Sequence, residues 1–272
     1  MIVDFHTHAF PDALAGRVIP ALAEKSNARP YTDGTAEGLR RKLAESGVTL
    51  GVVLPVVTRV GQFESVNGFA ARLNGSGRLL SFGGIHPDDA DYKEHLRHIR
   101  RAGLRGIKLH PDYQGVYIDD ERYVRIAREA LSLGLIVVTH AGVDDGYPDD
   151  VHCPPQRAAR FLDAVYAGGE GDAARIVFAH GGGNRQFGDV LRCLAGRAVY
   201  FDLSYIFNYA RPEELAPLIR AHGAHRILFA SDCPWGDPAD GIRFVNALPL
   251  TEEERRAVFS ENARALLGGL PE

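Results

Sequence analysis

Histidines and one aspartate follow apolar stretches at separate places along the chain. His6 and His8 close the first stretch, and His140, His180 and Asp232 follow later ones. Residues two apart on an extended chain leave the same face, so His6 and His8 can share one ion. Neutral imidazole and carboxylate are ligands of Zn²⁺, and also of Fe²⁺ and Mn²⁺. The pattern predicts a divalent metal site, with Zn²⁺ as the expected ion and one exchangeable position for water.

The elements that must position these residues are apolar runs that alternate with helical segments. The runs are residues 1–5, 48–57, 79–85, 104–109, 135–139, 175–179, 198–203 and 225–230. Helical periodicity or composition is found at 40–45, 66–73, 91–101, 119–132, 155–166, 187–195, 212–221, 239–247 and 251–267. Parallel strands buried on both faces have this near-continuous apolar character, and eight strand–helix units form a closed barrel.

The predicted fold class is therefore α/β, a (β/α)8 TIM barrel formed by one domain over residues 1–272. An open doubly wound sheet is the alternative, and it is disfavoured because no G-x-G-x-x-G motif follows an early strand. No linker, internal repeat or low-complexity tract marks a domain boundary. Residues 9–36 and 141–154 follow histidine-bearing strand ends, and we expect them to be loops that cover a site.

Barrel closure would bring distant residues of this set together. The carboxyl ends of the strands form the face that carries the active site in such barrels. Strand eight lies beside strand one, which places Asp232 next to His6 and His8, while His140 faces them across the axis. We therefore expect these four side chains to hold one ion.

Four short motifs resemble the amidohydrolase superfamily: HTH at 6–8, HAG at 140–142, AHGGG at 179–183 and ASDCPW at 230–235. More narrowly, they are similar to the amidohydrolase-related, single-zinc group that includes aminocarboxymuconate semialdehyde decarboxylase. The resemblance implies that His6, His8 and His140 are metal ligands and that Asp232 is a ligand or the catalytic carboxylate. It also implies that His180 is the acid or base that contacts the substrate.

Lys108 leaves open whether the centre holds one metal ion or two. A carboxylated lysine at the end of strand four bridges two ions in one branch of the superfamily, whereas in the single-metal group the lysine is not a bridge. We favour one ion, with the Lys108 ammonium paired to a substrate carboxylate or a neighbouring acid.

Further polar and aromatic residues near strand ends are candidate substrate contacts. His86 and His110 are each followed by proline, so either they line the cavity or they cap their strands. The remaining candidates are Arg185, Tyr205 and Trp235. Four other histidines are expected to be solvated at the surface: His95, His98, His222 and His225.

Composition restricts the partners. The chain has 31 basic and 35 acidic residues and a net charge of −4, which offers no electrostatic reason to expect nucleic acid or an anionic membrane. A small-molecule substrate is the expected partner. The three cysteines lie far apart, and no apolar run is long enough to cross a bilayer, so we expect a cytoplasmic protein. Proteins of the resembling group often pair, and a homodimer is one expected state.

Three functions are compatible with this pattern. The first is a metal-dependent hydrolase that uses activated water on an amide, ester or lactone bond of a small carboxylated metabolite, with Asp232 taking a proton and His180 assisting the leaving group. The second is a non-hydrolytic carboxy-lyase (decarboxylase) or a hydratase that uses the same mononuclear site. The third is a metal-binding barrel without turnover, which the presence of both His180 and Asp232 disfavours.

Overall fold

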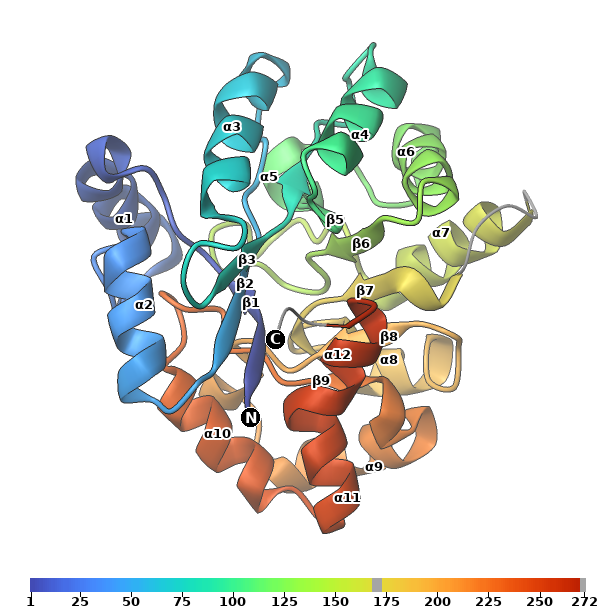
Figure 1. The fold of residues 1–272 in the computed structure, drawn as a ribbon. Helices are drawn as coiled ribbons and strands as arrows, with labels where there is room; N and C mark the ends of the chain where they lie inside the picture. The colour runs from blue at the N-terminus through green and yellow to red at the C-terminus, as the bar shows by residue number, and fades with distance from the viewer. Residues whose placement is uncertain (168–172, 270–272) are drawn as a thin grey trace.

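A computed structural model describes residues 1–167 and 173–269, and its strands form a parallel barrel (Figure 1). The first sheet segment has the order β1-β2-β3 and the second the order β4-β5-β6-β7-β8-β9. Every pairing is parallel among the described strands. Their bounds are β1 Val3–Thr7, β2 Leu50–Val53, β3 Leu79–Ser81, β4 Gly83–Gly84, β5 Gly106–Leu109, β6 Ile136–Thr139, β7 Ile176–Phe178, β8 Tyr200–Asp202 and β9 Ile227–Leu228.

The predicted (β/α)8 barrel is confirmed. Strands β3 and β4 are two pieces of the single run 79–85, separated by Phe82. Seven of the eight predicted runs contain their strands, and the run 1–5 overlaps β1, which continues to Thr7. Backbone hydrogen bonds close the barrel between its last and first strands: Phe5 N donates to Phe229 O (2.9 Å) and Asp232 N donates to His6 O (2.8 Å). Closure therefore places the segment after β9 directly beside β1.

Helices surround the barrel, as Figure 1 shows. Their bounds are α1 Asp12–Ser26, α2 Ala36–Glu45, α3 Phe63–Leu73, α4 Tyr92–Arg101, α5 Pro111–Gln114, α6 Glu121–Ser132, α7 Pro155–Ala167, α8 Phe187–Cys193, α9 Pro212–His222, α10 Pro238–Ala247, α11 Glu252–Arg256 and α12 Asn262–Leu266. None of the helices in the described part of the chain combines the length and the apolar character needed to cross a bilayer.

The expectation that residues 9–36 form a loop is wrong, because helix α1 occupies Asp12–Ser26. Gly16 and Pro20 lie inside this helix and weaken its sequence signal, since both residues disfavour helix interiors. Asn27 ends it in the left-handed conformation, with φ of 50°. Residues 141–154 contain no helix or extended strand, as expected.

Alternate strand residues form two separate apolar clusters. Val53, Ile107 and Phe178 belong to the larger cluster, which also includes residues of the surrounding helices. The smaller cluster includes Phe5 and Phe82, which pack edge to face, together with residues of α12. The β1–β2 register shifts between Asp4 and Thr7, so the regular strand pairing is interrupted in the segment that carries His6.

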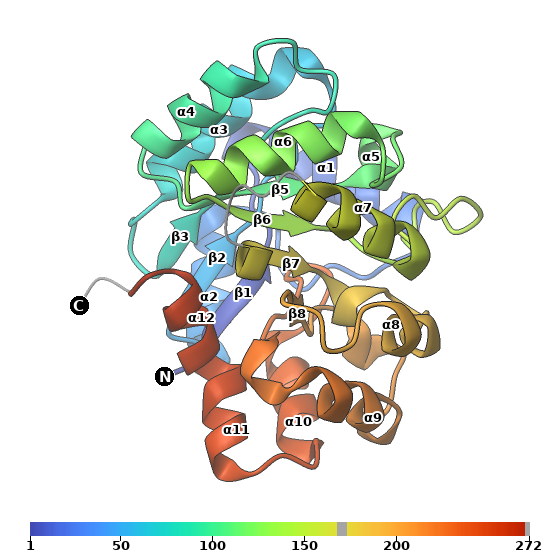
Figure 2. The same cartoon turned by 90° about the vertical axis from the view of Figure 1, so that its right-hand side faces the viewer.

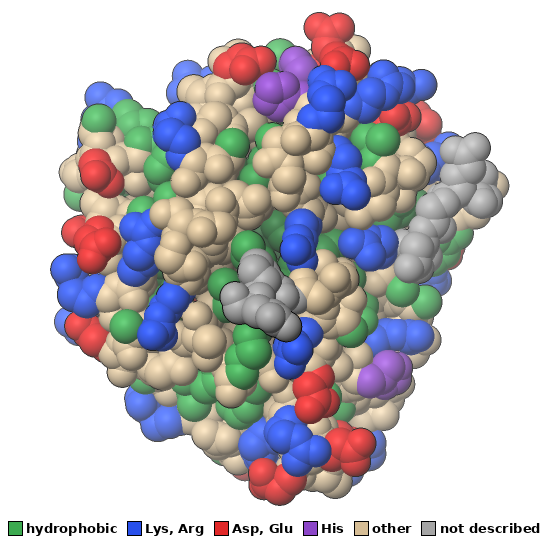
Figure 3. Space-filling model, viewed as in Figure 1, with side chains coloured by type: hydrophobic (Ala, Val, Ile, Leu, Met, Phe, Trp, Pro, Cys, Tyr) green, Lys and Arg blue, Asp and Glu red, His purple; other side chains and the backbone are tan. Residues whose placement is uncertain are grey.

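The two ends of the barrel differ in what they carry. Figure 2 shows the N-terminus and α12 at one end, and α5 and the loop of residues 141–154 at the end toward which the strands point. The face drawn in Figure 3, viewed as in Figure 1, has basic and acidic side chains interspersed around its rim. The loops that build the site therefore lie at the other end of the barrel, where the strands end.

His222 is buried rather than solvated, which corrects the expectation for this histidine. Its side chain is 3% exposed and its ring stacks on Phe201 at 3.9 Å. Its Nε2 donates to Val199 O (3.0 Å), and its Nδ1 accepts from Gly196 N (3.2 Å). Burial lowers the pKa of His222 to about 4, although the hydrogen bond to Val199 O acts in the opposite direction.

Protonation of His222 should destabilise the fold in acid. Its pKa in the folded state lies below the unfolded value of 6.5, so its contribution is complete above pH 6.5 and is lost as the pH falls toward 4. Between pH 7 and pH 5 the wild type should lose about 2 kcal/mol more unfolding free energy than His222→Gln. Urea titrations at both pH values measure this difference. His225→Gln, at an exposed histidine, is the control, and equal losses in wild type and His222→Gln would contradict the prediction.

Candidate metal centre

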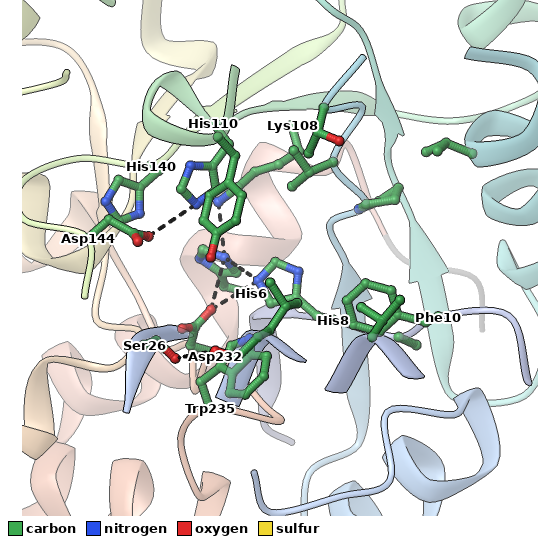
Figure 4. Close-up of a pocket in the computed structure, with 18 of the residues that line it drawn as sticks. His6, His8, Phe10, Ser26, Lys108, His110, His140, Asp144, Asp232 and Trp235 are labelled. Atoms are coloured by element: carbon green, nitrogen blue, oxygen red, sulfur yellow. Dashed lines mark hydrogen bonds and ion pairs between the residues drawn. The ribbon is translucent and has the colours of Figure 1, made fainter. Parts of the chain in front are cut away.

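Three ligand atoms converge at the carboxyl end of the barrel. The Nε2 atoms of His6 and His8 are 3.2 Å apart, and Asp232 Oδ1 lies 3.3 Å from the first and 3.1 Å from the second. His6 and His8 come from the end of β1, and Asp232 follows β9, which barrel closure places alongside. Figure 4 shows the three side chains pointing toward one another. The structure thus brings together three of the four predicted ligands.

In both His6 and His8, the ring nitrogen that points away from Asp232 donates a hydrogen bond to an acceptor. His8 Nδ1 donates to Leu54 O (3.0 Å), and His6 Nδ1 donates to Asp202 Oδ2 (2.9 Å). Burial, followed by the positive charge of Lys108, lowers the pKa of His6 to about 3, so this ring is neutral. A neutral imidazole that donates through Nδ1 presents a lone pair at Nε2.

This arrangement fits a divalent cation. His6 Nε2, His8 Nε2 and Asp232 Oδ1 face one another within hydrogen-bonding distance, so one ion could contact all three atoms. Burial raises the pKa of Asp232, but His6 and His8 outweigh it and bring the pKa to about 2, so Asp232 is a carboxylate. Two imidazole nitrogens, whose rings are oriented by outer partners, and one carboxylate oxygen form a typical donor set for Zn²⁺ or Mn²⁺.

Asp202 and Ser204 are supporting residues to which sequence reasoning assigned no role. Besides holding His6, Asp202 accepts hydrogen bonds at Oδ1 from the backbone N–H groups of His180 and Ser204, both at 3.0 Å. Burial opposes ionisation of Asp202, but His6 holds its pKa well below the ordinary value. The sequence shows Asp202 and Ser204 at the end of the seventh apolar run, but it does not show which residues they contact.

Lys108 belongs to the metal centre rather than to a remote part of the cavity. It is fully buried, and its Nζ lies 3.0 Å from His6 Nε2. Burial lowers the pKa of Lys108 to about 8, although Asp202 and Asp232 act in the opposite direction. The lysine therefore lies beside the predicted ligands, where it can contact a substrate group that reaches them.

His140 lies in a neighbouring group. Its Nδ1 is 3.0 Å from His180 Nε2, and its ring stacks on His110 at 4.4 Å. With His110 and Asp144 it forms a second set of side chains close enough to hold an ion, distinct from that of His6, His8 and Asp232. Asp144 is a member of this set that the sequence did not indicate. Burial raises the pKa of Asp144 to about 7. The assignment of His140 as the fourth ligand remains a prediction.

His180 is held firmly in an unusual backbone conformation. Its Nδ1 lies 2.9 Å from Ser204 Oγ and 3.0 Å from Ser204 O, and Nε2 is directed toward His140. His180, Tyr205 and Asp232 have φ values of 57°, 64° and 68°, in the left-handed region that residues other than glycine rarely adopt. Such strain persists where the surrounding structure imposes it, and it is typical of functional sites.

A cavity of about 470 Å³ opens onto this cluster. Most predicted site residues line it, namely His6, His8, Lys108, His110, His140, His180, Tyr205, Asp232 and Trp235. Among the described residues, His86 and Arg185 are not part of the lining. His86 Nδ1 accepts from Asp88 N (3.1 Å), as a strand-end cap would. The Arg185 guanidinium pairs with Asp145 (2.7 Å) and lies over the Tyr209 ring.

Comparison with known proteins identifies a family. A family model described as amidohydrolase matches residues 3–269, whereas no curated protein matches the chain. Similar solved structures include 5-carboxyvanillate decarboxylase from Sphingomonas paucimobilis, with a TM-score of 0.71 and 15% identity over 99% of each chain. A putative 2-pyrone-4,6-dicarboxylic acid hydrolase from Pseudomonas putida has a TM-score of 0.67 and 20% identity, over 100% of this chain and 98% of the other.

A third similar structure contains a metal. It is a dihydroxybenzoic acid decarboxylase from a Polaromonas species with bound manganese and the inhibitor 2-nitroresorcinol, with a TM-score of 0.68 and 16% identity, over 98% of this chain and 96% of the other. At these identities the three likenesses show a shared fold, and they include both decarboxylases and a hydrolase.

Metal content is the first test of the centre. Protein purified without a chelator should contain about one divalent ion per chain, because His6, His8 and the ionised Asp232 form one set of ligands. The second set is disfavoured because burial raises the pKa of Asp144 to about 7, so this carboxyl is partly protonated at neutral pH. His8→Ala should reduce the bound metal to a small fraction, as measured by elemental analysis. His98→Ala, at an exposed histidine, should retain it. Two ions per chain would contradict the single-ion prediction.

Asp202→Asn tests the outer support of His6. The amide has nearly the same shape as the carboxylate but no charge, so His6 loses the partner that orients its ring. We expect metal affinity to fall by about 10- to 100-fold, measured by competition with a chromophoric chelator. Asp163→Asn, at an exposed carboxylate paired with Arg197, is the matched control. Unchanged affinity in Asp202→Asn would show that Asp202 does not support the ligand.

Proposed function

Because this chain belongs to the amidohydrolase family, we propose that it is a metal-dependent hydrolase that cleaves an amide, ester or lactone bond of a small carboxylated metabolite. The observation that carries the proposal is the convergence of two imidazole lone pairs and an ionised carboxylate at the floor of a cavity. A substrate in this cavity would meet the metal ligands and the acid–base residues together.

The proposed ligands are His6, His8 and Asp232, with His140 as the fourth, and Zn²⁺ as the ion ahead of Fe²⁺ and Mn²⁺. A divalent ion at such a site polarises a carbonyl oxygen and lowers the pKa of water. The chain's own residues must then accept, hold and deliver protons. Lys108, beside His6, supplies a positive charge for an anionic group of the substrate.

Asp232 can accept a proton because its pKa of about 2 keeps it ionised at neutral pH. Its Oδ1 is the proposed ligand atom beside His8, so the proton would go to the other carboxylate oxygen, and only transiently, because a carboxylate with such a low pKa is a weak base. His180 is suited to assist the leaving group, because Ser204 holds its Nδ1 side and its Nε2 is directed into the cavity toward His140. These roles make Asp232 the proposed base and His180 the proposed acid.

A carboxy-lyase reaction is the second candidate. The cavity wall is mainly apolar outside the strand ends, with residues such as Phe10, Phe69 and Val143. A desolvated carboxylate loses CO₂ more readily than a hydrated one, and two of the similar solved structures are decarboxylases. Hydrolysis and decarboxylation use the same ligands, so the products must discriminate them.

The remaining proposals concern the protein's state. We infer a cytoplasmic location from three free cysteines, of which Cys153 and Cys233 are buried. A homodimer is the proposed assembly on the basis of the family resemblance.

Product analysis discriminates the two reactions. Metal-replete protein should hydrolyse members of a panel of carboxylated esters, lactones and amides without releasing CO₂, which infrared detection monitors. A pH-stat measures the proton released from esters and lactones, and an amine-reactive dye measures the amine released from amides, whose hydrolysis gives no net proton at neutral pH. Release of CO₂ from hydroxybenzoates, without hydrolysis of any ester, amide or lactone, would replace the hydrolase by the carboxy-lyase.

His180→Ala tests the acid–base assignment. Loss of the proton donor should reduce kcat by about 10²- to 10⁴-fold, because that is the usual contribution of general acid–base catalysis. Elemental analysis should show that the variant keeps its metal, which separates a proton-transfer defect from a ligand defect. His98→Ala is the control, and an unchanged kcat in His180→Ala would remove this residue from the mechanism.

A further inference from the structure

We propose that the natural substrate is amphipathic, with a small polar reacting head and an extended apolar tail that lies between helices α1 and α3. The inference rests on the proposed function for the identity of the head. The evidence for the tail is the part of the cavity wall that α1 and α3 form.

Helix α1 has two apolar stripes. Ala15 and Ile19 are buried and attach the helix to the body of the protein. Leu14, Val18 and Leu22 are four residues apart, so they form a second stripe on another side of the helix. All three line the cavity, as does Ser26 one turn further along. A helix that only covered the barrel would need one stripe, so the second is available for a ligand.

Helix α3 supplies the facing wall. Phe63, Asn67 and Ala70 are buried against the protein. Ser65, Val66 and Phe69 lie at helical spacing on another side, and all three line the same cavity. Figure 1 shows α1 between α2 and α3 at the edge of the barrel. Two helices from separate parts of the chain thus present apolar side chains to one space.

The length of this wall exceeds that of a compact ring. Leu14 and Leu22 are eight residues apart, so at about 1.5 Å per residue the apolar stripe extends for about 12 Å, and Ser26 continues the lining by one further turn. The whole cavity, at about 470 Å³, is in the range that holds drug-sized ligands. A substrate consisting of one small ring would occupy the strand ends and leave the stripe in contact with water.

The walls that α1 and α3 contribute carry no charge among the described residues. The charged lining residues are Lys108, Asp144, Asp145 and Asp232 at the strand ends and their loops, and Arg59, an exposed residue in the segment before α3. Lys25, next to Ser26, directs its ammonium over the Tyr147 ring at 3.4 Å. An ionic group within the tail would therefore lose its hydration without gaining a partner. The wall selects an uncharged, apolar tail.

Straight-chain carboxylates provide a probe of the tail that does not depend on catalysis. Calorimetric titration of the metal-replete protein with the series from butanoate to decanoate should show affinity rising by about threefold per added methylene, as each one leaves water for the apolar wall. Affinity that does not change with chain length would overturn the proposal.

Two variants locate the tail. Val18→Trp narrows the space between the helices and should weaken decanoate binding at least tenfold, with butanoate affinity within twofold of wild type. Leu14→Asp places a charge on the stripe at a position that is 38% exposed, which the fold tolerates, and should give the same selective loss. Leu191→Trp, at a residue of α8 that is 39% exposed, is the control. Equal losses for butanoate and decanoate in both stripe variants would contradict the placement.

The 4-nitrophenyl esters of the same acids separate this inference from the proposed function. If the acids bind with the chain-length dependence but the wild type hydrolyses none of the esters or the other hydrolytic probes, the tail site stands and the hydrolytic function fails. If the esters are hydrolysed with kcat/KM independent of chain length, the function stands and the tail site fails.

Discussion

The site depends on hydrogen bonds that point away from it. His6 and His8 each donate from Nδ1 to an acceptor behind the ring, the Asp202 carboxylate and the carbonyl oxygen of Leu54. These bonds set the tautomer, so both Nε2 lone pairs face Asp232. Three acceptors held this close are stable together only when a positive charge lies among or beside them, and the buried Lys108 is one such neighbour. The rest of the structure serves to keep the acceptors in place.

Barrel closure is the constraint that makes this cluster possible. The backbone bonds between the end of β1 and the segment after β9 place His6 beside Asp232, although nearly the whole chain separates them. Asp202, at the end of β8, then reaches both the His6 ring and the backbone of His180. One buried carboxylate thereby couples the proposed metal ligand to the proposed acid. The left-handed backbone at His180 and Asp232 is the local strain that this convergence imposes.

Helix α1 connects the architecture to substrate choice. A helix that follows the first strand of a barrel needs one apolar face to pack, and Ala15 and Ile19 provide it. The second face, with Leu14, Val18 and Leu22, gives the cavity an apolar wall. The strand ends are thus equipped for chemistry, and the helices above them for recognition, which agrees with the division of roles in (β/α)8 barrels.

The sequence alone determined the eight strands, their parallel barrel and the positions of His6, His8 and Asp232 at one end of it. These properties follow from local periodicity and from the spacing of residues along an extended chain, both of which can be read without coordinates. Helix α1 was not predicted, because Gly16 and Pro20 obscure its helical periodicity. The tertiary structure alone decided that Asp202 supports His6, that His140 stacks on His110, and that His222 is buried. Such pairings depend on side-chain direction after the barrel has closed, and no local pattern encodes which distant partner a polar side chain will meet.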